Sequence, residues 1–206
     1  MQEKITVTRK TTESSIKVTI QKGKLAPDYR KKIRTPHPFL NHMIEHIAWR
    51  AALNIEIDME LDEFELVHLV TEDVSMTLGR AVRAYIQKNA PEGYGYGIGI
   101  IDEAQAVAAV SFEDRAHLDF TSAVPYQEFV EGIPAEELIT FLEGFAQGAR
   151  CTLHMDIKKG ENGHHIWEAV YRAFGIALGA ALSENPARKG LTSGVAGKVI
   201  YEVSDN

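Results

Sequence analysis

Two stretches of this 206-residue chain repeat each other: EDVSMTLGRAV at residues 72–82 and EAVYRAFGIAL at residues 168–178. Their glutamate, glycine and apolar positions match at a constant offset of 96 residues, and the same offset places His68 over His164. Two unrelated amphipathic helices could share an apolar stripe, but a stripe need not reproduce a glutamate, a glycine and a histidine at identical spacing. The sequence therefore indicates an internal duplication.

Weaker similarity extends the repeat upstream. Phe39-Leu40 resembles Phe141-Leu142, and the alternating segment at 53–57 resembles the one at 153–157, each with a small shift in register. Between the copies, the glycine- and proline-containing segment 90–97 breaks the pattern. We therefore expect a first half at residues 1–90 and a second half at residues 91–206, together forming one compact unit.

Local patterns predict the same kinds of element in both halves, because alternating apolar residues indicate strands and a spacing of three to four indicates helices. In the first half we expect two strands within 4–21, a helix at 39–52, a strand at 53–61 and a helix at 66–88. In the second half we expect strands at 97–101, 105–112 and 116–120, a helix at 134–150, a strand at 152–157 and a helix at 164–182.

Composition is that of an ordinary folded protein, with 45% apolar residues, 25% charged residues and a net charge of −7. Positive charge is scattered apart from a short basic run at 30–34, so nucleic-acid binding is not expected. No apolar run reaches the roughly 20 residues that cross a bilayer, so we expect no membrane partner and a cytoplasmic location. The single cysteine, Cys151, lies in an apolar segment and is expected to be an inert core residue.

Histidine and glutamate recur at helical spacing in both copies. Residues three or four apart share a helix face, so His68 can share a site with Glu72, and either His164 or His165 can share one with Glu168. Imidazole and carboxylate ligands together suit a divalent ion such as Mn, Zn or Fe. The adjacent His165 points about 100° away from His164, so both can bind only if they serve different ions. A two-metal arrangement follows from this spacing.

Other side chains could complete such sites. His42 and His46 are four apart on the predicted helix 39–52, and His154 lies in the predicted strand 152–157. Each could instead be a surface or satisfied core histidine, but their clustering favours metal ligation. Glu13 taken alone is an exposed carboxylate, and the acidic pair at 102–103 is typical of a turn.

Six short segments are spread over nearly the whole chain: RKTTES at 9–14, FLNHMI at 39–44, HLVTED at 68–73, IDEA at 101–104, TLH at 152–154 and HHIWEA at 164–169. Together they resemble the imidazoleglycerol-phosphate dehydratase family. At the matching positions, family members carry Arg-x-Thr-x-Glu-Thr, Phe-Leu-Asp-His-Met-Leu, His-His-Thr-x-Glu-Asp, Met-Asp-Glu-Ala, Thr-Leu-His and His-His-x-x-Glu-Ala.

The resemblance implies an α+β fold like ribosomal protein S5 domain 2, duplicated as two β-β-β-α-α halves with sheets packed against paired helices. It also implies a hydro-lyase of histidine biosynthesis, which removes water from imidazole glycerol phosphate to give imidazole acetol phosphate. Two Mn ions per subunit would act as Lewis acids, held between the subunits of a 24-subunit homo-oligomer.

The same resemblance assigns roles to individual residues. The carboxylates expected to take part in catalysis are Glu13, as the base, with Glu72 and Glu168. The residues expected to contact the phosphorylated imidazole substrate are Asp102, Arg115, Arg172 and Lys198. The expected metal ligands are His42, His68, Glu72, His154, His164, His165 and Glu168, with His46 as a further candidate.

Four functional positions depart from the family pattern. Leu69 replaces the second histidine of the first pair and cannot ligate a metal, so one site loses a ligand unless His46 substitutes for it. Asn41 replaces an aspartate that would orient its histidine neighbour. Arg50 stands where the family has histidine, and Gly93 aligns with a phosphate-binding arginine.

These departures leave three functions compatible with the sequence. The first is a working dehydratase with a modified metal site. The second is a diverged homologue that keeps one metal and acts on another substrate, and the third is a non-catalytic metal-binding assembly protein. The motifs favour dehydratase chemistry.

Overall fold

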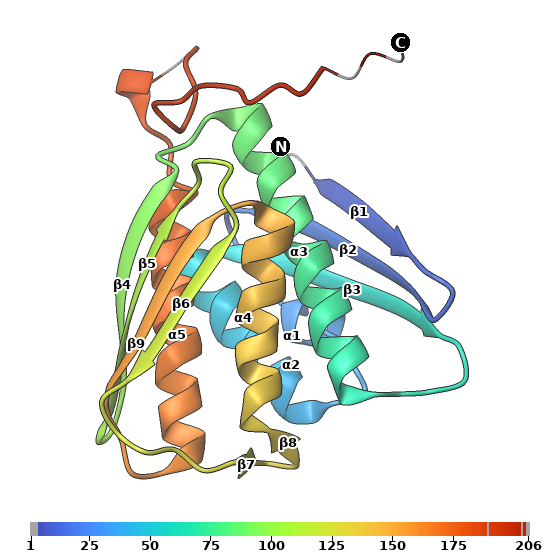
Figure 1. Cartoon of the computed structure of the whole chain (residues 1–206), viewed down its shortest axis with the longest axis vertical. Coiled ribbons are helices and arrows are strands. Elements are labelled where there is room, and N and C mark those ends of the chain that lie inside the picture. The colour runs from blue at the N-terminus through green and yellow to red at the C-terminus, as the bar shows by residue number, and fades with distance from the viewer. Residues whose placement is uncertain (1–3, 189, 203, 205–206) are drawn as a thin grey trace.

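The structure is a computed structural model that describes residues 4–188, 190–202 and 204. A three-stranded and a four-stranded sheet enclose four long helices, and the described residues include a further two-stranded sheet (Figure 1). The first half contains, in chain order, β1 (Ile5–Lys10), β2 (Ser14–Lys22), the short α1 (Tyr29–Lys32), α2 (Pro38–Ala51), β3 (Leu53–Leu61) and α3 (Val67–Asn89). The second half contains β4 (Tyr94–Ile101), β5 (Ala104–Ser111), β6 (His117–Ser122), β7 (Phe129–Val130), β8 (Ile133–Pro134), α4 (Ala135–Ala149), β9 (Thr152–Lys159) and α5 (Gly163–Ala181), followed by a 3₁₀ turn at Pro186–Arg188.

The α+β class is confirmed, and α3 and α5 begin 96 residues apart, at Val67 and Gly163. The order β-β-β-α-α that the family resemblance implies is not the chain order, because in each half a long helix precedes the last strand, as the local patterns at 39–61 and 134–157 predicted. The residues after α2 and α4, Ala52 and Arg150, are in the left-handed conformation and turn the chain into the strand that follows. The boundary between halves at residues 90 and 91 stays a prediction.

Each of the three strands of the first sheet has a counterpart in the second sheet. The first has the order β1-β2-β3 and is antiparallel throughout. The second has the order β4-β5-β9-β6, in which β4, β5 and β9 repeat the antiparallel arrangement and β6 adds a parallel strand beside β9. The extra strand is therefore the main structural difference between the halves.

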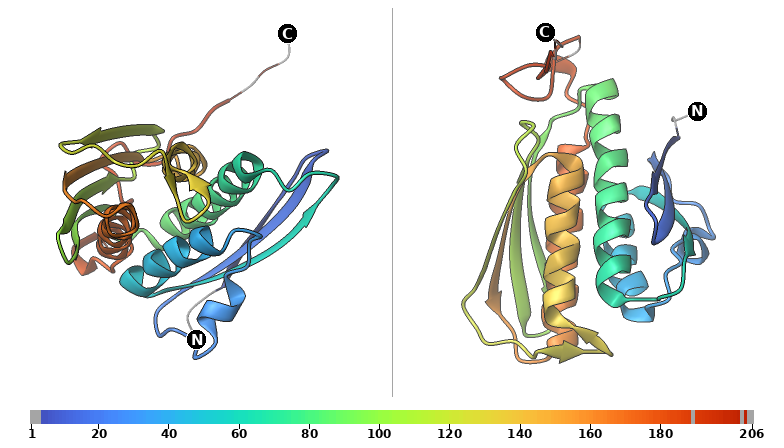
Figure 2. Two further views of the ribbon diagram at one scale, coloured as in Figure 1. Left: turned by 90° about the horizontal axis from the view of Figure 1, so that it is seen from below. Right: turned by 45° about the vertical axis from the view of Figure 1, so that its right-hand side comes forward.

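The helices form the two inner layers of the molecule. α2 and α3 contact the first sheet, and α5 contacts β4 and β5 of the second. Across the middle, α3 packs on α4 and α2 packs on α5, so the halves meet helix against helix (Figure 2). Burial of apolar side chains on both sides of this helical layer supplies the main driving force for folding.

The repeated glycine of the two motifs sits at these helix crossings. A Cβ atom on Gly79 would lie 2.4 Å from the carbonyl oxygen of Phe145 in α4. A Cβ atom on Gly175 would lie 2.9 Å from Cβ of Arg50 in α2. Both distances are shorter than ordinary packing contacts, so glycine allows the backbones to approach. The duplication thus preserved a packing requirement as well as the histidine and glutamate positions.

Strand β4 begins earlier than the sequence predicts, and its glycines explain the difference. The segment 90–97 was expected to be a break, but the strand begins at Tyr94. Gly95, Gly97 and Gly99 face α5, and a Cβ atom on each would clash with a carbonyl oxygen of that helix. These residues serve close packing rather than a turn.

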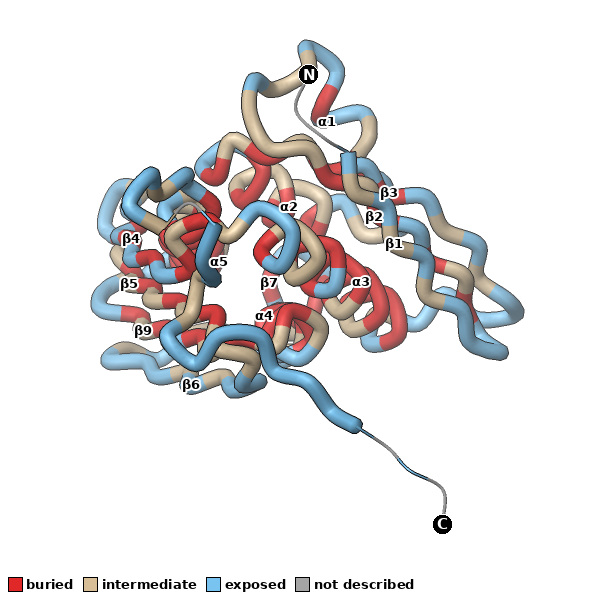
Figure 3. The backbone as a smooth tube through the Cα atoms, turned by 90° about the horizontal axis from the view of Figure 1, so that it is seen from above, coloured by how far each residue is buried: buried red, intermediate tan, exposed pale blue. Residues whose placement is uncertain are grey.

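Buried residues concentrate where the helices face one another, whereas the segment after α5 is largely exposed (Figure 3). Cys151 is fully buried, as expected of a core residue, and burial raises the pKa of its thiol to about 12. Within the described residues, no helix combines the length and apolar character needed to cross a membrane.

Candidate metal centre

The start of α5 fixes the second histidine/glutamate motif. The side chain of Asn162 caps the helix and accepts hydrogen bonds from the backbone N–H groups of His164 and His165. One turn further, Nε2 of His164 lies 3.3 Å from Oε2 of Glu168, whose carboxylate is buried. The predicted helical spacing therefore does bring these two side chains together.

Helix α2 adds two histidines to this pair. His42 Nε2 lies 3.4 Å from Glu168 Oε2, and His46 Nε2 lies 3.4 Å from Glu168 Oε1. The two α2 nitrogens are 3.3 Å apart. Ligand atoms of His42, His164 and Glu168 all lie within 4.8 Å of one another, so one divalent cation could contact all three. This donor set fits a metal ion.

The electrostatics of this group favour an ionised Glu168 carboxylate and a neutral His46 imidazole, which are the forms that bind metals. Burial opposes ionisation of Glu168, but the nearby His46 and Arg172 outweigh it, and the pKa of Glu168 lies below its usual value. Burial lowers the pKa of His46 to about 4, against the opposing attraction of Glu168. His46 is therefore a neutral ligand candidate at neutral pH.

Arg172 also belongs to this cluster. Its guanidinium forms an ion pair with Glu168 and donates a hydrogen bond of 2.8 Å to the carbonyl oxygen of Ile100. Its buried Nε–H has no hydrogen-bond partner among the described residues. Arg172 thus holds the carboxylate from one side and keeps one donor that a ligand could use.

His165 faces a different site from His164. Its Nδ1 lies 2.8 Å from Oε2 of Glu103, and its Nε2 lies 3.8 Å from the exposed Asp102. The hydrogen bond to Glu103 raises the pKa of His165. Backbone N–H bonds from the start of α5, chiefly that of Asn162, lower the pKa of Glu103 to about 2. The two adjacent histidines therefore diverge, as expected from the helical angle.

The first motif, on α3, has a different environment. Nδ1 of the exposed His68 lies 3.0 Å from Oε2 of Glu137, a buried carboxylate in the first turn of α4. Glu72 is half-buried on the same helix, and Leu69 is buried in the apolar core. His46 contacts Glu168 of the α5 motif, so within one chain it is a candidate ligand there, and its substitution for the histidine missing at Leu69 stays a prediction.

A sequence model of the imidazoleglycerol-phosphate dehydratase family matches residues 35–178 of this chain. The chain belongs to the imidazoleglycerol-phosphate dehydratase family. The imidazoleglycerol-phosphate dehydratase of Cupriavidus taiwanensis is 35% identical over 87% of this chain and 91% of its own length. That of Thioalkalivibrio sulfidiphilus is 32% identical over 97% of this chain and all of its own length. The crystal structure of IGPD from Pyrococcus furiosus is 31% identical, with a TM-score of 0.72 over 87% of this chain and 95% of that chain.

Several residues expected from the dehydratase family lie apart from the α2–α5 group. His154 is exposed on β9, with its Nδ1 3.7 Å from Asp119. Glu13 is exposed in the turn between β1 and β2, where its backbone N–H donates to Thr11 Oγ1. Arg115 is exposed just before β6. Within one chain the structure therefore does not assemble the full set expected for the dehydratase family.

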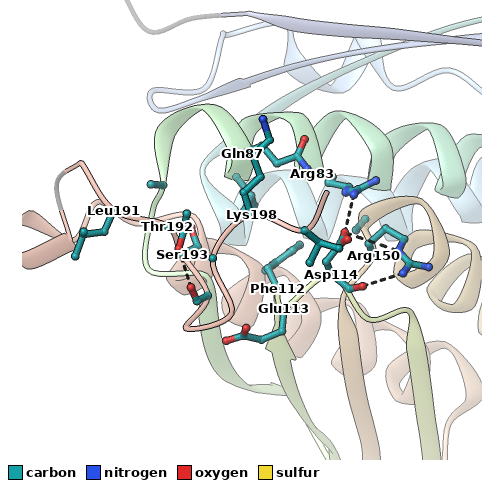
Figure 4. A pocket seen from close by; sticks show the side chains of 16 residues that line it. Arg83, Gln87, Phe112, Glu113, Asp114, Arg150, Leu191, Thr192, Ser193 and Lys198 are labelled. Carbon is teal, nitrogen blue, oxygen red and sulfur yellow. Dashed lines mark hydrogen bonds and ion pairs between the residues drawn. The ribbon is translucent and has the colours of Figure 1, made fainter. Parts of the chain in front are cut away.

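Lys198 lines a pocket at the far end of α3 (Figure 4). There Arg83 pairs with Asp114 at 2.6 Å, and Arg150 donates to the Asp114 carbonyl at 2.9 Å. The pocket is capped by the C-terminal segment that carries Lys198. It lies at the opposite end of α3 from His68, so it is not part of the metal cluster of this chain.

Three of the departures from the dehydratase pattern have local explanations. Asn41 bonds the backbone of Thr35 through both atoms of its amide, so it orders the turn before α2 rather than orienting His42. Gly93 has a positive φ of 71°, and a Cβ atom there would lie 2.5 Å from Cβ of Ser193, so no arginine fits this conformation. Leu69 serves the core.

Proposed function

We propose that this chain is a metal-dependent hydro-lyase that converts imidazole glycerol phosphate into imidazole acetol phosphate. One observation carries the proposal: in a chain of the dehydratase family, His42, His164 and Glu168 converge to within 4.8 Å at the crossing of α2 and α5. A bound divalent ion would supply Lewis-acid polarisation of the substrate imidazole. The place in histidine biosynthesis follows from this reaction, and a cytoplasmic location stays a prediction from sequence.

The ion that we propose is Mn²⁺. Nitrogen and carboxylate oxygen donors together suit it, although other first-row metals accept the same set. A second ion per subunit would be bound by His68 and Glu72 of the α3 motif. Further ligands, such as His154 and His165, would come from surfaces that lie apart from this motif within one chain. Because Leu69 contributes no ligand, we expect this second ion to bind more weakly.

Residues of the chain would handle protons and orientation. Arg172 holds Glu168 ionised and offers its remaining Nε–H to the substrate. Glu13, exposed at a hairpin tip, would take up the proton removed from the glycerol chain. Asp102 would bind the substrate beside His165, and Arg115 and Lys198 would bind its phosphate through charge-assisted hydrogen bonds.

We further propose that these separated groups meet in a homo-oligomer, with 24 subunits as the family resemblance implies. The separation of Glu13, His154 and the α2–α5 group within one chain supports this assembly. The outer face of β4 supports it as well, because Tyr94, Tyr96, Ile98 and Ile100 are all exposed there. If metals bridge subunits, chelation should reduce particle size in light scattering, and an unchanged size would argue against metal-dependent assembly.

A second candidate is a diverged homologue with one metal and another substrate. The burial of Leu69 in the core favours it, since the second metal site has lost a ligand at this position. A non-catalytic metal-binding assembly protein would show metal uptake without turnover.

The direct test is formation of imidazole acetol phosphate by the Mn-loaded protein. We expect turnover by wild type and loss of at least about 100-fold in Glu168→Ala, because the variant lacks a metal ligand. Glu143→Ala, which removes an exposed carboxylate from α4, is the matched control and should keep full activity. Wild-type turnover no higher than that of Glu168→Ala would refute the dehydratase proposal. Metal uptake with no turnover of this substrate would then be consistent with either the diverged homologue or the non-catalytic protein.

A further inference from the structure

The buried carboxylate of Glu137 lies against the inner nitrogen of an exposed histidine. Glu137 Oε2 is 3.0 Å from Nδ1 of His68 and Oε1 is 3.3 Å from the same atom. The side chain of His68 is 63% exposed, whereas Glu137 as a residue is only 8% exposed. The ring is therefore held from the protein side, and its opposite edge, which carries Nε2, faces away from the buried carboxylate.

Glu137 is itself held in place. The hydroxyl of the fully buried Thr71 lies 3.1 Å from Glu137 Oε2. Glu137 is also in the first turn of α4, where the positive end of the helix dipole stabilises a carboxylate. Among the described residues, the side-chain partners of Glu137 are the Thr71 hydroxyl and Nδ1 of His68, so a carboxylate fixed in this way can accept a hydrogen bond from Nδ1–H of His68.

In the second half, a carboxylate also contacts Nδ1 of His165, but this carboxylate comes from a different structural element. Glu103 lies in the turn between β4 and β5. Its Oε2 is 2.8 Å from Nδ1 of His165, while its Oε1 accepts the backbone N–H bonds of Asn162 and Glu161. Glu137 comes from a helix and Glu103 from a strand turn, so simple duplication does not account for both contacts. The shared feature is a fixed carboxylate at Nδ1.

We propose that Glu137 and Glu103 are positioning residues that keep the proton of His68 and His165 on Nδ1 and so leave Nε2 free to bind metal. A hydrogen bond to one ring nitrogen fixes which tautomer a histidine adopts and how its ring is oriented. The inference rests on the proposed metal-dependent function and adds two residues to it. It matters most at His68, since Leu69 leaves that residue as the sole histidine of the α3 motif.

The tautomer can be read without metal. Magic-angle-spinning NMR of metal-free protein labelled with ¹⁵N-histidine, at about pH 8 where histidine is neutral, reports which ring nitrogen carries the proton. The His68 signal is identified by its absence in His68→Gln. We expect the proton on Nδ1 in wild type and a shift towards Nε2 in Glu137→Leu. Glu136→Gln, an exposed neighbour in the same turn, should leave the signal unchanged.

Mn²⁺ titration supplies the second readout. Removing a carboxylate that hydrogen-bonds a metal-binding histidine typically weakens metal binding by about 10- to 100-fold. We therefore expect Mn²⁺ affinity to fall by that factor at one class of site in Glu137→Leu and in Glu103→Leu. A purely structural role would lower thermal stability without moving the tautomer. A wild-type His68 with its proton on Nε2, or unchanged Mn²⁺ affinity in both variants, would overturn the inference. Failure of wild type to bind Mn²⁺ would instead overturn the proposed function, and the NMR result still decides the orientation of His68.

Discussion

Replacing the two repeated glycines with alanine tests how the helix crossings support the site. In Gly175→Ala the added Cβ would meet Arg50 Cβ at 2.9 Å and the His46 carbonyl oxygen at 3.0 Å. Restoring ordinary contact requires α2 and α5 to separate by roughly half an ångström. In Gly79→Ala the corresponding distances, to the Phe145 carbonyl oxygen and the Ala149 nitrogen, are 2.4 and 2.7 Å, so α3 and α4 must separate by roughly one ångström.

The expected loss of stability follows from two opposing effects. Overpacking typically costs about 1–3 kcal/mol, while Gly→Ala in a helix returns about 0.5–1 kcal/mol. We expect a net loss of about 0.5–2 kcal/mol for Gly175→Ala and about 2 kcal/mol or more for Gly79→Ala. For a chain of this length 1 kcal/mol corresponds to about 2–4 °C in melting temperature. The two variants should therefore differ in a thermal scan at fixed protein concentration.

The two variants should also distinguish effects on helix packing from effects on metal binding. Gly175→Ala displaces the helix of His42 and His46 from that of Glu168, so it should weaken Mn²⁺ binding, whereas Gly79→Ala should leave the α2–α5 group intact. Gln147→Ala, at an exposed position of α4, controls for helix propensity. The reasoning fails if Gly79→Ala is stabilised as an ordinary helical Gly→Ala would be, or if Gly175→Ala binds Mn²⁺ as wild type does.

Three further outcomes are expected. Asp73→Asn should destabilise the protein by about 2–3 kcal/mol in urea unfolding, because the buried Asp73 carboxylate pairs with Arg9 at 2.7 Å and accepts from Ser14; a loss under 0.5 kcal/mol would contradict this. The pKa of His46 is about 4, below the usual 6.5, so between these values the unfolded chain binds a proton that the folded protein does not. Metal-free protein should therefore lose about 1–2 kcal/mol as pH falls through that window, after allowance for solvent screening, and His46→Gln should flatten the profile. The thiol of Cys151, with its pKa raised by burial to about 12, should resist a disulfide-exchange reagent at pH 8 until the protein is unfolded, and prompt labelling of the native state would show that it is accessible.

Sequence periodicity predicted most of this fold because the relevant signals are local. The strand at 53–61 and the starts of α3 and α5 follow from alternation and from the repeat. At β4 the prediction from composition was wrong. The alternating glycines indicated a break between elements, whereas in the structure they allow the strand to pack closely against α5. A glycine selected for close approach and one selected for a turn look alike in a single sequence.

In the candidate site, too, local contacts are predictable from sequence and long-range contacts are not. The pairing of His164 with Glu168 depends on helical spacing and is visible in sequence. The contacts of His68 with Glu137 and of Arg172 with Ile100 join residues 69 and 72 positions apart, and no local pattern marks them. Arg172, which is expected to contact the substrate, pairs with Glu168 in the structure, and its contact with substrate stays a prediction. Long-range polar contacts of this kind depend on tertiary packing.

The most direct measurement of the central claim is anomalous diffraction at the Mn absorption edge from crystals of the Mn-loaded protein. The account predicts an anomalous peak in contact with His42, His164 and Glu168 at the crossing of α2 and α5. Well-occupied Mn²⁺ elsewhere, with no peak beside Glu168, would contradict it.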